Sequence, residues 1–188
     1  MGPLNAPLRK PVRQGDLDGL CGLYALVNAL DLLAAKPPSP ALQKALFQEL
    51  IRALPAPKLR KAMSAGLEGK DLIKAARIAF PPHKRALGGR IEVSRPFRRQ
   101  TFKTSEELAA ELGERIYTGD TALLINFATP TYAHWSVASA IKPAAIALRD
   151  SSSTRSLSLD KYAVRRGPYR IRTRETLMLH IHPLKHLK

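Results

Sequence analysis

Apolar residues recur at helical spacing through the first part of the chain. Helical patterns cover residues 19–35, 40–54 and 58–80. The first is apolar on nearly every side, which is typical of a buried helix, and Asp18 is its expected N-cap. Ser39 is the expected N-cap of the second, and glycines at positions 66 and 69 interrupt the third. This part of the chain therefore predicts several helices around one buried member.

The pattern becomes strand-like after a pair of prolines at positions 81 and 82. Strands are expected over residues 90–102, 121–128, 134–141, 144–149, 156–159 and 169–182, the last as one strand or as two joined at a bend. One more helix is expected over residues 105–115, capped by Thr104 or Ser105.

Helices first and strands second predict an α+β fold. We expect residues 1–13 to form an N-terminal arm and residues 14–188 to form a single domain. Within that domain, a helical half of about residues 14–80 would pack on an antiparallel sheet half of about residues 90–183.

The composition, 45% hydrophobic and 24% charged over 188 residues, is that of a globular domain and excludes a wholly disordered chain. The sequence has no apolar run long enough to cross a membrane, and residues 1–10 lack the apolar stretch of a secretory signal. We therefore expect no membrane partner, and a protein that is cytoplasmic or is delivered into a target cell without a cleavable signal peptide.

The single cysteine, Cys21, excludes an internal disulfide and a cysteine-based zinc site. It lies at the expected start of the buried helix, where unpaired N–H groups and the helix dipole stabilise a thiolate. Gly19 and Gly22 flank it and permit close approach, so Gly22 is a candidate substrate contact. The alternative is an inert thiol in the core.

A histidine and an aspartate occur where a hairpin brings two strands together. His134 begins one strand and Asp150 ends the next, with turn residues at Lys142 and Pro143 between them. A turn centred near Lys142 would place His134 directly opposite Asp150, so that the carboxylate can hold one imidazole nitrogen. Trp135, the next residue, either packs in the core or forms a wall of the site.

Cysteine, histidine and aspartate together match the roles of nucleophile, base and orienting group. Such a site also needs donors for an oxyanion. The backbone N–H of Cys21 is one candidate, and the side-chain amide of Gln14 is the other.

The segment from Gln14 to Leu30 resembles the nucleophile helix of papain-like cysteine peptidases, in the style of the compact bacterial branch that includes the bacteriocin-leader-processing peptidases. His134 and Asp150 follow in the order seen in that family. The resemblance implies a papain-like fold with Cys21 as nucleophile, His134 as base, Asp150 as orienting residue and Gln14 in the oxyanion hole. One departure is that Gln14 lies seven residues before the cysteine, where the family has six.

The resemblance implies a cysteine protease that cleaves a protein or peptide through a thioester. A glutamine deamidase or acyltransferase of the toxin or effector type would use the same three residues. A non-catalytic, basic module that binds polyanions, with an inert Cys21, is an alternative of another class. No cofactor and no metal are expected, since His180, His182 and His186 have no carboxylate near them in the sequence.

The charge is strongly unbalanced, because 31 Lys and Arg residues face 15 Asp and Glu residues to give a formal +16. Such an excess attracts acidic partners. An acidic patch on a protein substrate is the favoured partner, with residues 165–174 contributing, and nucleic acid is less favoured because no nucleic-acid-binding motif is evident. Genome composition alone is the competing explanation. An inhibitor or immunity protein is a partner class that the sequence leaves open.

Overall fold

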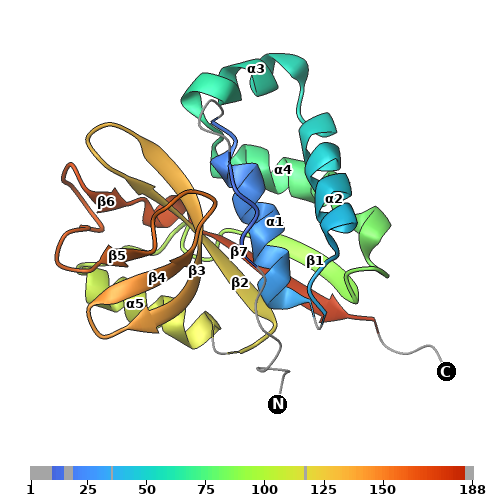
Figure 1. Ribbon diagram of the computed structural model, residues 1–188. Coiled ribbons are helices and arrows are strands. Elements are labelled where there is room, and N and C mark those ends of the chain that lie inside the picture. The colour runs from blue at the N-terminus through green and yellow to red at the C-terminus, as the bar shows by residue number, and fades with distance from the viewer. Residues whose placement is uncertain (1–9, 15–18, 35, 117, 185–188) are drawn as a thin grey trace.

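A computed structural model describes residues 10–14, 19–34, 36–116 and 118–184 of the chain (Figure 1). The α-helices in this part are α1 (Cys21–Leu33), α2 (Pro40–Arg52), α3 (Ala56–Ala65), α4 (Gly69–Ala79) and α5 (Ser105–Ile116). The strands are β1 (Gly89–Ser94), β2 (Thr121–Ala128), β3 (Ala133–Lys142), β4 (Ala145–Arg149), β5 (Ser156–Ser158), β6 (Arg170–Ile171) and β7 (Leu177–Pro183). Short 3₁₀ helices occupy Pro81–His83 and Thr173–Glu175.

The strands form one antiparallel sheet in the order β1-β7-β2-β3-β4-β5, and β6 pairs with β2 beyond the end of β7. The predicted α+β class, with four helices before the sheet, is confirmed within the described residues. None of the helices in the described residues has the length and apolar character needed to cross a membrane.

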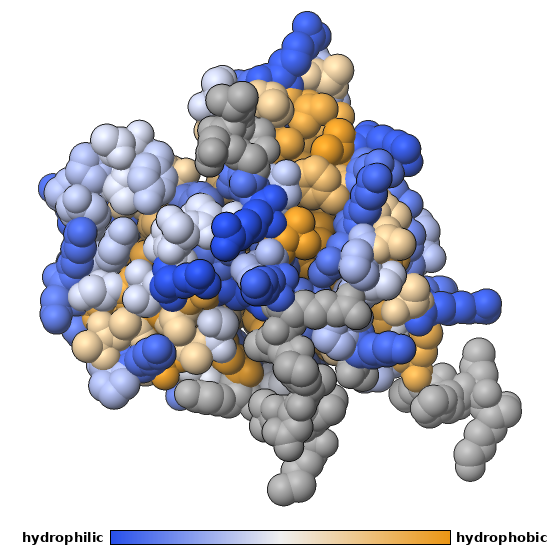
Figure 2. All heavy atoms as spheres, in the orientation of Figure 1, coloured by the Kyte–Doolittle hydropathy of each residue, from blue (hydrophilic) through white to orange (hydrophobic). Residues whose placement is uncertain are grey.

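Helices cover both faces of the sheet, and β2 shows this most clearly. Its residues Ala122 and Leu124 belong to the apolar core under α1, whereas Leu123, Ile125 and Phe127 belong to the core under α5. Alternate residues of a strand point to opposite faces, so a strand that is apolar throughout needs cover on both sides. Figure 2 shows hydrophilic side chains over most of one face of the molecule, with apolar side chains reaching the surface between α1, α2 and α3.

The start of α1 differs from the prediction. Leu20, not Asp18, is the N-cap, and no side chain caps this helix; Asp18 itself lies outside the described residues. Gly19 is held against α3, where its N–H donates to the Met63 carbonyl at 3.0 Å and a Cβ would lie 2.3 Å from the Ala62 carbonyl oxygen. This tight backbone contact fixes the chain just before the helix, and Cys21 is therefore the first helical residue.

The other expected helices agree with the structure. The Ser39 hydroxyl accepts from the Leu42 N–H at 3.2 Å at the start of α2, and Thr104 caps α5 by accepting from the Glu107 N–H at 3.2 Å. The interruption between α3 and α4 is confirmed, because Gly66 ends α3 with a positive φ of 73°.

The structure changes the bounds of one expected strand and decides whether another is one strand or two. The strand expected over residues 90–102 ends at Ser94, because Pro96 has no N–H to continue the ladder. Phe97 and Phe102 instead pack edge to face under α5, with ring centroids 5.1 Å apart. The segment 169–182 is two strands joined at a bend, with the 3₁₀ helix Thr173–Glu175 between them.

A buried ion pair joins α1 to the sheet. Arg149, at the end of β4, contacts Asp31 in the last turns of α1, and the side chains are 7% and 0% exposed. The Gln43 amide on α2 donates to the other oxygen of Asp31 at 2.9 Å. This cluster fixes α1, α2 and β4 relative to one another next to Asp150, because a buried charge requires its partner in place.

Replacing Arg149 with Met should lower the free energy of unfolding by about 3–5 kcal/mol, because the buried Asp31 carboxylate loses its opposite charge. Urea denaturation followed by circular dichroism measures the change. The double variant Asp31→Leu/Arg149→Met should recover most of the loss, since no charge is left unpaired. A double variant as unstable as the single one would show that packing, and not charge, is what Arg149 supplies.

Candidate functional site

Cys21 lies at the positive end of the buried helix α1. It is the first residue of the helix and is 5% exposed. The N–H groups of a first helical turn have no acceptor within their own helix. The backbone around Cys21 therefore offers donors and a positive partial charge to a negative group placed there.

His134, the second residue of β3, lies between Cys21 and Asp150. Its Nε2 is 2.8 Å from Asp150 Oδ1, and both residues are buried, at 7% and 5% exposed. The ring is also hydrogen-bonded to the Cys21 side chain. Because Nε2 faces the carboxylate, Nδ1 is the nitrogen left for the thiol. The three residues that the sequence singled out thus meet, from α1, β3 and the residue after β4 (Figure 1).

The strand register that produces this contact differs from the predicted one. Val137 pairs with Arg149, so the continuing register brings Asp150 opposite Ser136 and not opposite His134. The turn is centred on residues 143–144, and a bulge between Ala138 and Ala140 shifts the pairing by one. The net error is two residues, which keeps His134 and Asp150 on the same face as diagonal neighbours.

The Asp150 carboxylate is held by groups besides His134. Its Oδ2 accepts from the Ser152 N–H at 2.9 Å and from the Ser152 hydroxyl, and the Ser136 hydroxyl also contributes. Burial alone would raise the pKa of Asp150, but the hydrogen bond and charge of His134, together with the two serine hydroxyls, outweigh it and hold that pKa below its ordinary value. Asp150 is therefore a fixed negative charge.

His134 is the positive member of the site. Burial by itself lowers the pKa of its imidazole, but the hydrogen bonds to Asp150 and Cys21 and the charges of both raise the pKa from 6.5 to about 9. The Phe127 and Tyr132 rings make T-shaped contacts with the imidazole, with centroid distances of 5.5 and 6.3 Å. The ring is thus protonated at neutral pH and is confined by aromatic neighbours.

Gln14 lies next to the aspartate end of the site. Its backbone N–H donates to the Ser151 carbonyl at 2.9 Å, and the Ser151 hydroxyl donates to its Oε1 at 3.5 Å. Asn28 of α1 holds the same segment, because it bonds both the N–H (2.8 Å) and the carbonyl (3.1 Å) of Val12. These bonds hold the segment so that Gln14 lies beside the residue that follows Asp150.

The other two candidate residues belong to the core. The Trp135 side chain is 2% exposed and its indole N–H donates to the Leu67 carbonyl at 2.9 Å. Gly22 packs on α4, where a Cβ would lie 2.8 Å from the Leu72 side chain. Trp135 therefore packs in the core, which is one of the two roles expected for it, and Gly22 packs against α4. Contact of either residue with substrate stays a prediction.

The histidines near the C-terminal end of the described chain have separate acidic neighbours. His180 Nδ1 lies 3.7 Å from Asp120, and His182 Nε2 lies 3.0 Å from Glu92. These carboxylates, distant in sequence, were missed by the sequence argument. Over residues 10–14, 19–34, 36–116 and 118–184, no three His, Cys, Asp or Glu side chains are placed to hold a metal ion. His186 lies outside that part.

Sequence reasoning also missed Ser136 and Ser152, the two hydroxyl groups on Asp150. One signal was present, because the serine run 151–153 follows Asp150 directly and an aspartate commonly accepts from the N–H two residues later. Comparison with models of known protein families gives no match, and comparison with curated proteins gives no similar sequence.

The protonated imidazole should make stability depend on pH. Since the pKa of His134 is raised, its contribution is fully present below about pH 6.5 and is lost as the pH rises through about 9. Thermal melts across this range should show a larger fall for the wild type than for His134→Gln. The variant His182→Gln, at an exposed histidine paired with Glu92, should keep the wild-type slope. Parallel curves for the wild type and His134→Gln would contradict the assignment.

Proposed function

We propose that the protein is a papain-like thiol hydrolase, and that cleavage of a peptide bond in a protein substrate is its reaction. The observation that carries the proposal is the buried contact series from the Cys21 side chain through His134 to Asp150. A nucleophile, a base and an orienting group in hydrogen-bonded sequence are what acyl transfer by a thiol requires.

In this proposal Cys21 reacts as a thiolate beside the protonated imidazole of His134. The sulfur attacks the substrate carbonyl carbon, and the electron pair of the C=O bond moves to oxygen. The oxyanion accepts from the Cys21 N–H and from the Gln14 amide, whose oxygen is turned to Ser151. As the C–N bond breaks, the imidazolium gives its proton to the leaving amine.

The resulting thioester is then hydrolysed. His134, now neutral, takes a proton from water, the hydroxide oxygen attacks the thioester carbonyl, and the C–S bond breaks to release a carboxylic acid and the Cys21 thiolate. Asp150 stays ionised throughout and keeps the imidazole in place. A glutamine side chain as substrate would follow the same steps, with ammonia as the leaving group, and deamidation is therefore the second candidate.

The burial of charge argues against an inert cysteine. Keeping His134 and Asp150 ionised in the interior costs solvation free energy, and an apolar pair would avoid that cost. A histidine whose pKa is strongly raised, hydrogen-bonded to a cysteine side chain, is typical of a reactive site. A polyanion-binding module would need none of these groups, although the formal charge of +16 suits one.

Alkylation by iodoacetamide tests the proposed nucleophile, and Cys21 is the chain's single cysteine, so all labelling reports on it. At neutral pH the second-order rate should fall about tenfold or more in His134→Gln, because the imidazolium no longer stabilises the thiolate. Asp150→Asn should give a smaller loss, since this residue acts through His134. His182→Gln serves as the control and should label at the wild-type rate. A wild-type rate no higher than that of His134→Gln would exclude an activated thiol.

The reaction is identified by mass spectrometry of cellular proteins incubated with the wild type or with Cys21→Ala. New N-termini that depend on Cys21 would establish proteolysis, and conversion of glutamine to glutamate would establish deamidation. If Cys21 is labelled by iodoacetamide but neither product is found in a broad set of proteins, acyl transfer to an amine is the remaining reaction. Acyl transfer is detected as a mass addition on lysine. Salt-dependent DNA binding that is equal in the wild type and in Cys21→Ala, with no product, would support the non-catalytic module.

A further inference from the structure

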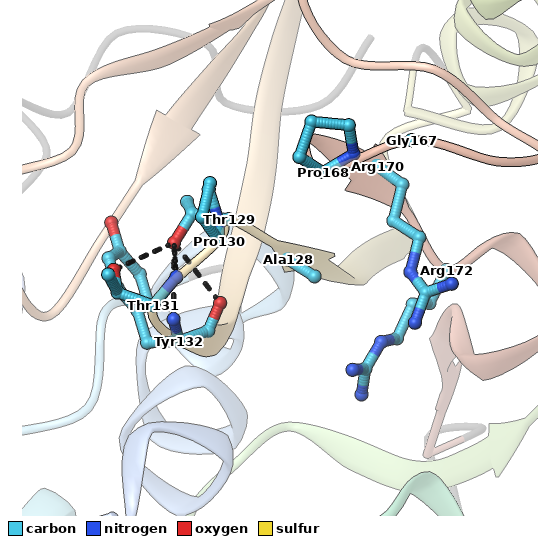
Figure 3. A pocket seen from close by; sticks show the side chains of 9 residues that line it. All are labelled: Ala128, Thr129, Pro130, Thr131, Tyr132, Gly167, Pro168, Arg170 and Arg172. Atoms are coloured by element: carbon cyan, nitrogen blue, oxygen red, sulfur yellow. Dashed lines mark hydrogen bonds between the residues drawn. The ribbon is translucent and has the colours of Figure 1, made fainter.

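A hollow of about 460 Å³ lies between the β2–β3 turn and the segment around β6 (Figure 3). On one side it is lined by the β2–β3 turn, where Thr129, Thr131 and Tyr132 bring hydroxyl groups. On the other side stand Arg170 of β6 and Arg172, which follows it. The hollow therefore combines two cationic side chains with neutral hydrogen-bonding groups.

The sheet register places this hollow next to His134. Ile171 pairs with Phe127 on one side of β2, and His134 pairs with the same Phe127 on the other. Arg170 and Arg172 flank Ile171, so their backbone lies two strand spacings from that of His134, or about 10 Å. Tyr132 lines the hollow and also lies against the His134 ring, at 6.3 Å between centroids.

Both arginines are available to a ligand. They are exposed, and no ion pair to either is formed within the described residues. Their bases are held by the sheet, since Arg170 pairs with Ala128 and the Arg172 N–H donates to the Asn126 carbonyl at 2.7 Å. Figure 3 shows both arginine side chains on the same side of the hollow, where two guanidinium groups can converge on an anion.

The opposite wall is also held in shape. The Thr129 hydroxyl accepts from the N–H groups of Thr131 and Tyr132 at 3.3 and 3.2 Å, and the Thr129 N–H donates to the Tyr132 carbonyl at 2.8 Å. The turn therefore gives the hollow a fixed wall opposite the arginines, while the arginines supply the ligand contacts. Two guanidinium groups are suited to a carboxylate, which accepts two parallel N–H bonds.

We propose that this hollow is a substrate subsite that binds the carboxylate of an aspartate or glutamate side chain close to the bond that Cys21 attacks. The proposal rests on the proposed function of Cys21 and narrows the substrate to peptides that are acidic at that position. The preference for acidic peptides would then come from contact with Arg170 and Arg172, and not from a general attraction to the formal charge of +16.

The experiment uses epoxysuccinyl peptide amides in the form of ethyl esters, which alkylate a thiolate. The reactive epoxide group is uncharged, and peptide can be attached on either side of the epoxide. Each probe carries one glutamate, or its neutral analogue glutamine, at one of three positions on either side. At one position the glutamate probe should label wild-type Cys21 about tenfold faster than the glutamine probe, the gain of one charge-assisted contact. Arg170→Gln/Arg172→Gln should abolish this preference by lowering the rate of the glutamate probe to that of the glutamine probe in the same variant.

Arg165→Gln/Arg166→Gln is the matched control, because it removes the same charge from exposed residues of the same loop that do not line the hollow. It should keep the preference for glutamate. Equal rates for glutamate and glutamine probes at every position, or a preference that survives Arg170→Gln/Arg172→Gln, would overturn the subsite. If both double variants lose the glutamate preference equally, general electrostatic attraction, and not a subsite, explains the preference. If no probe labels Cys21 faster in the wild type than in His134→Gln, the proposed thiol chemistry fails as well, and this result differs from each of the others.

Discussion

The position of α1 on the sheet is the constraint on which the rest of this structure depends. The helix carries Cys21 at its first residue and Asp31 near its last turn, and Asp31 is paired with Arg149 in the core. Apolar packing alone allows a helix to slide or rotate by small amounts, whereas a buried charge pair is satisfied in only one arrangement. Because Arg149 is followed directly by Asp150, the same contact that docks α1 also sets the distance between the thiol and the carboxylate end of the site.

The site adds a second set of buried charges to this frame. His134 is kept protonated between Cys21 and Asp150, and Asp150 is kept ionised by His134 and by the hydroxyls of Ser136 and Ser152. Each group loses solvation free energy when it is buried. Hydrogen bonds and opposite charges in the folded chain compensate for that loss, but only if all the groups are present. This interdependence explains why Cys21 and His134 lie on α1 and β3 and why Asp150 directly follows β4, since these elements hold the partners at hydrogen-bonding distance against the cost of burial.

The sequence alone was sufficient for the α+β class and for most elements, because their apolar spacing and their breaks at proline and glycine are local signals. It also singled out the three residues that meet at the site. It misplaced the pairing of His134 by two residues, since a turn position and a bulge depend on contacts across strands. The wrong N-cap and the packing of Gly22 against Leu72 have a common origin, because both are decided by α3 and α4, which pack against the start of α1.

The central strand β2 lies between the proposed catalytic base and the proposed substrate contact, which are far apart in the sequence. It pairs on one side with β3, which carries His134, and on the other with β6, which carries Arg170. The spacing between the proposed base and the proposed carboxylate contact is therefore fixed by backbone hydrogen bonds. The side chains that line the hollow lie on the β2–β3 turn and around β6, outside the Asp150–His134 contact. Substrate preference can consequently change through substitutions in those segments while the geometry at Cys21 stays intact, which is the division between variable loops and a rigid scaffold expected of a binding site.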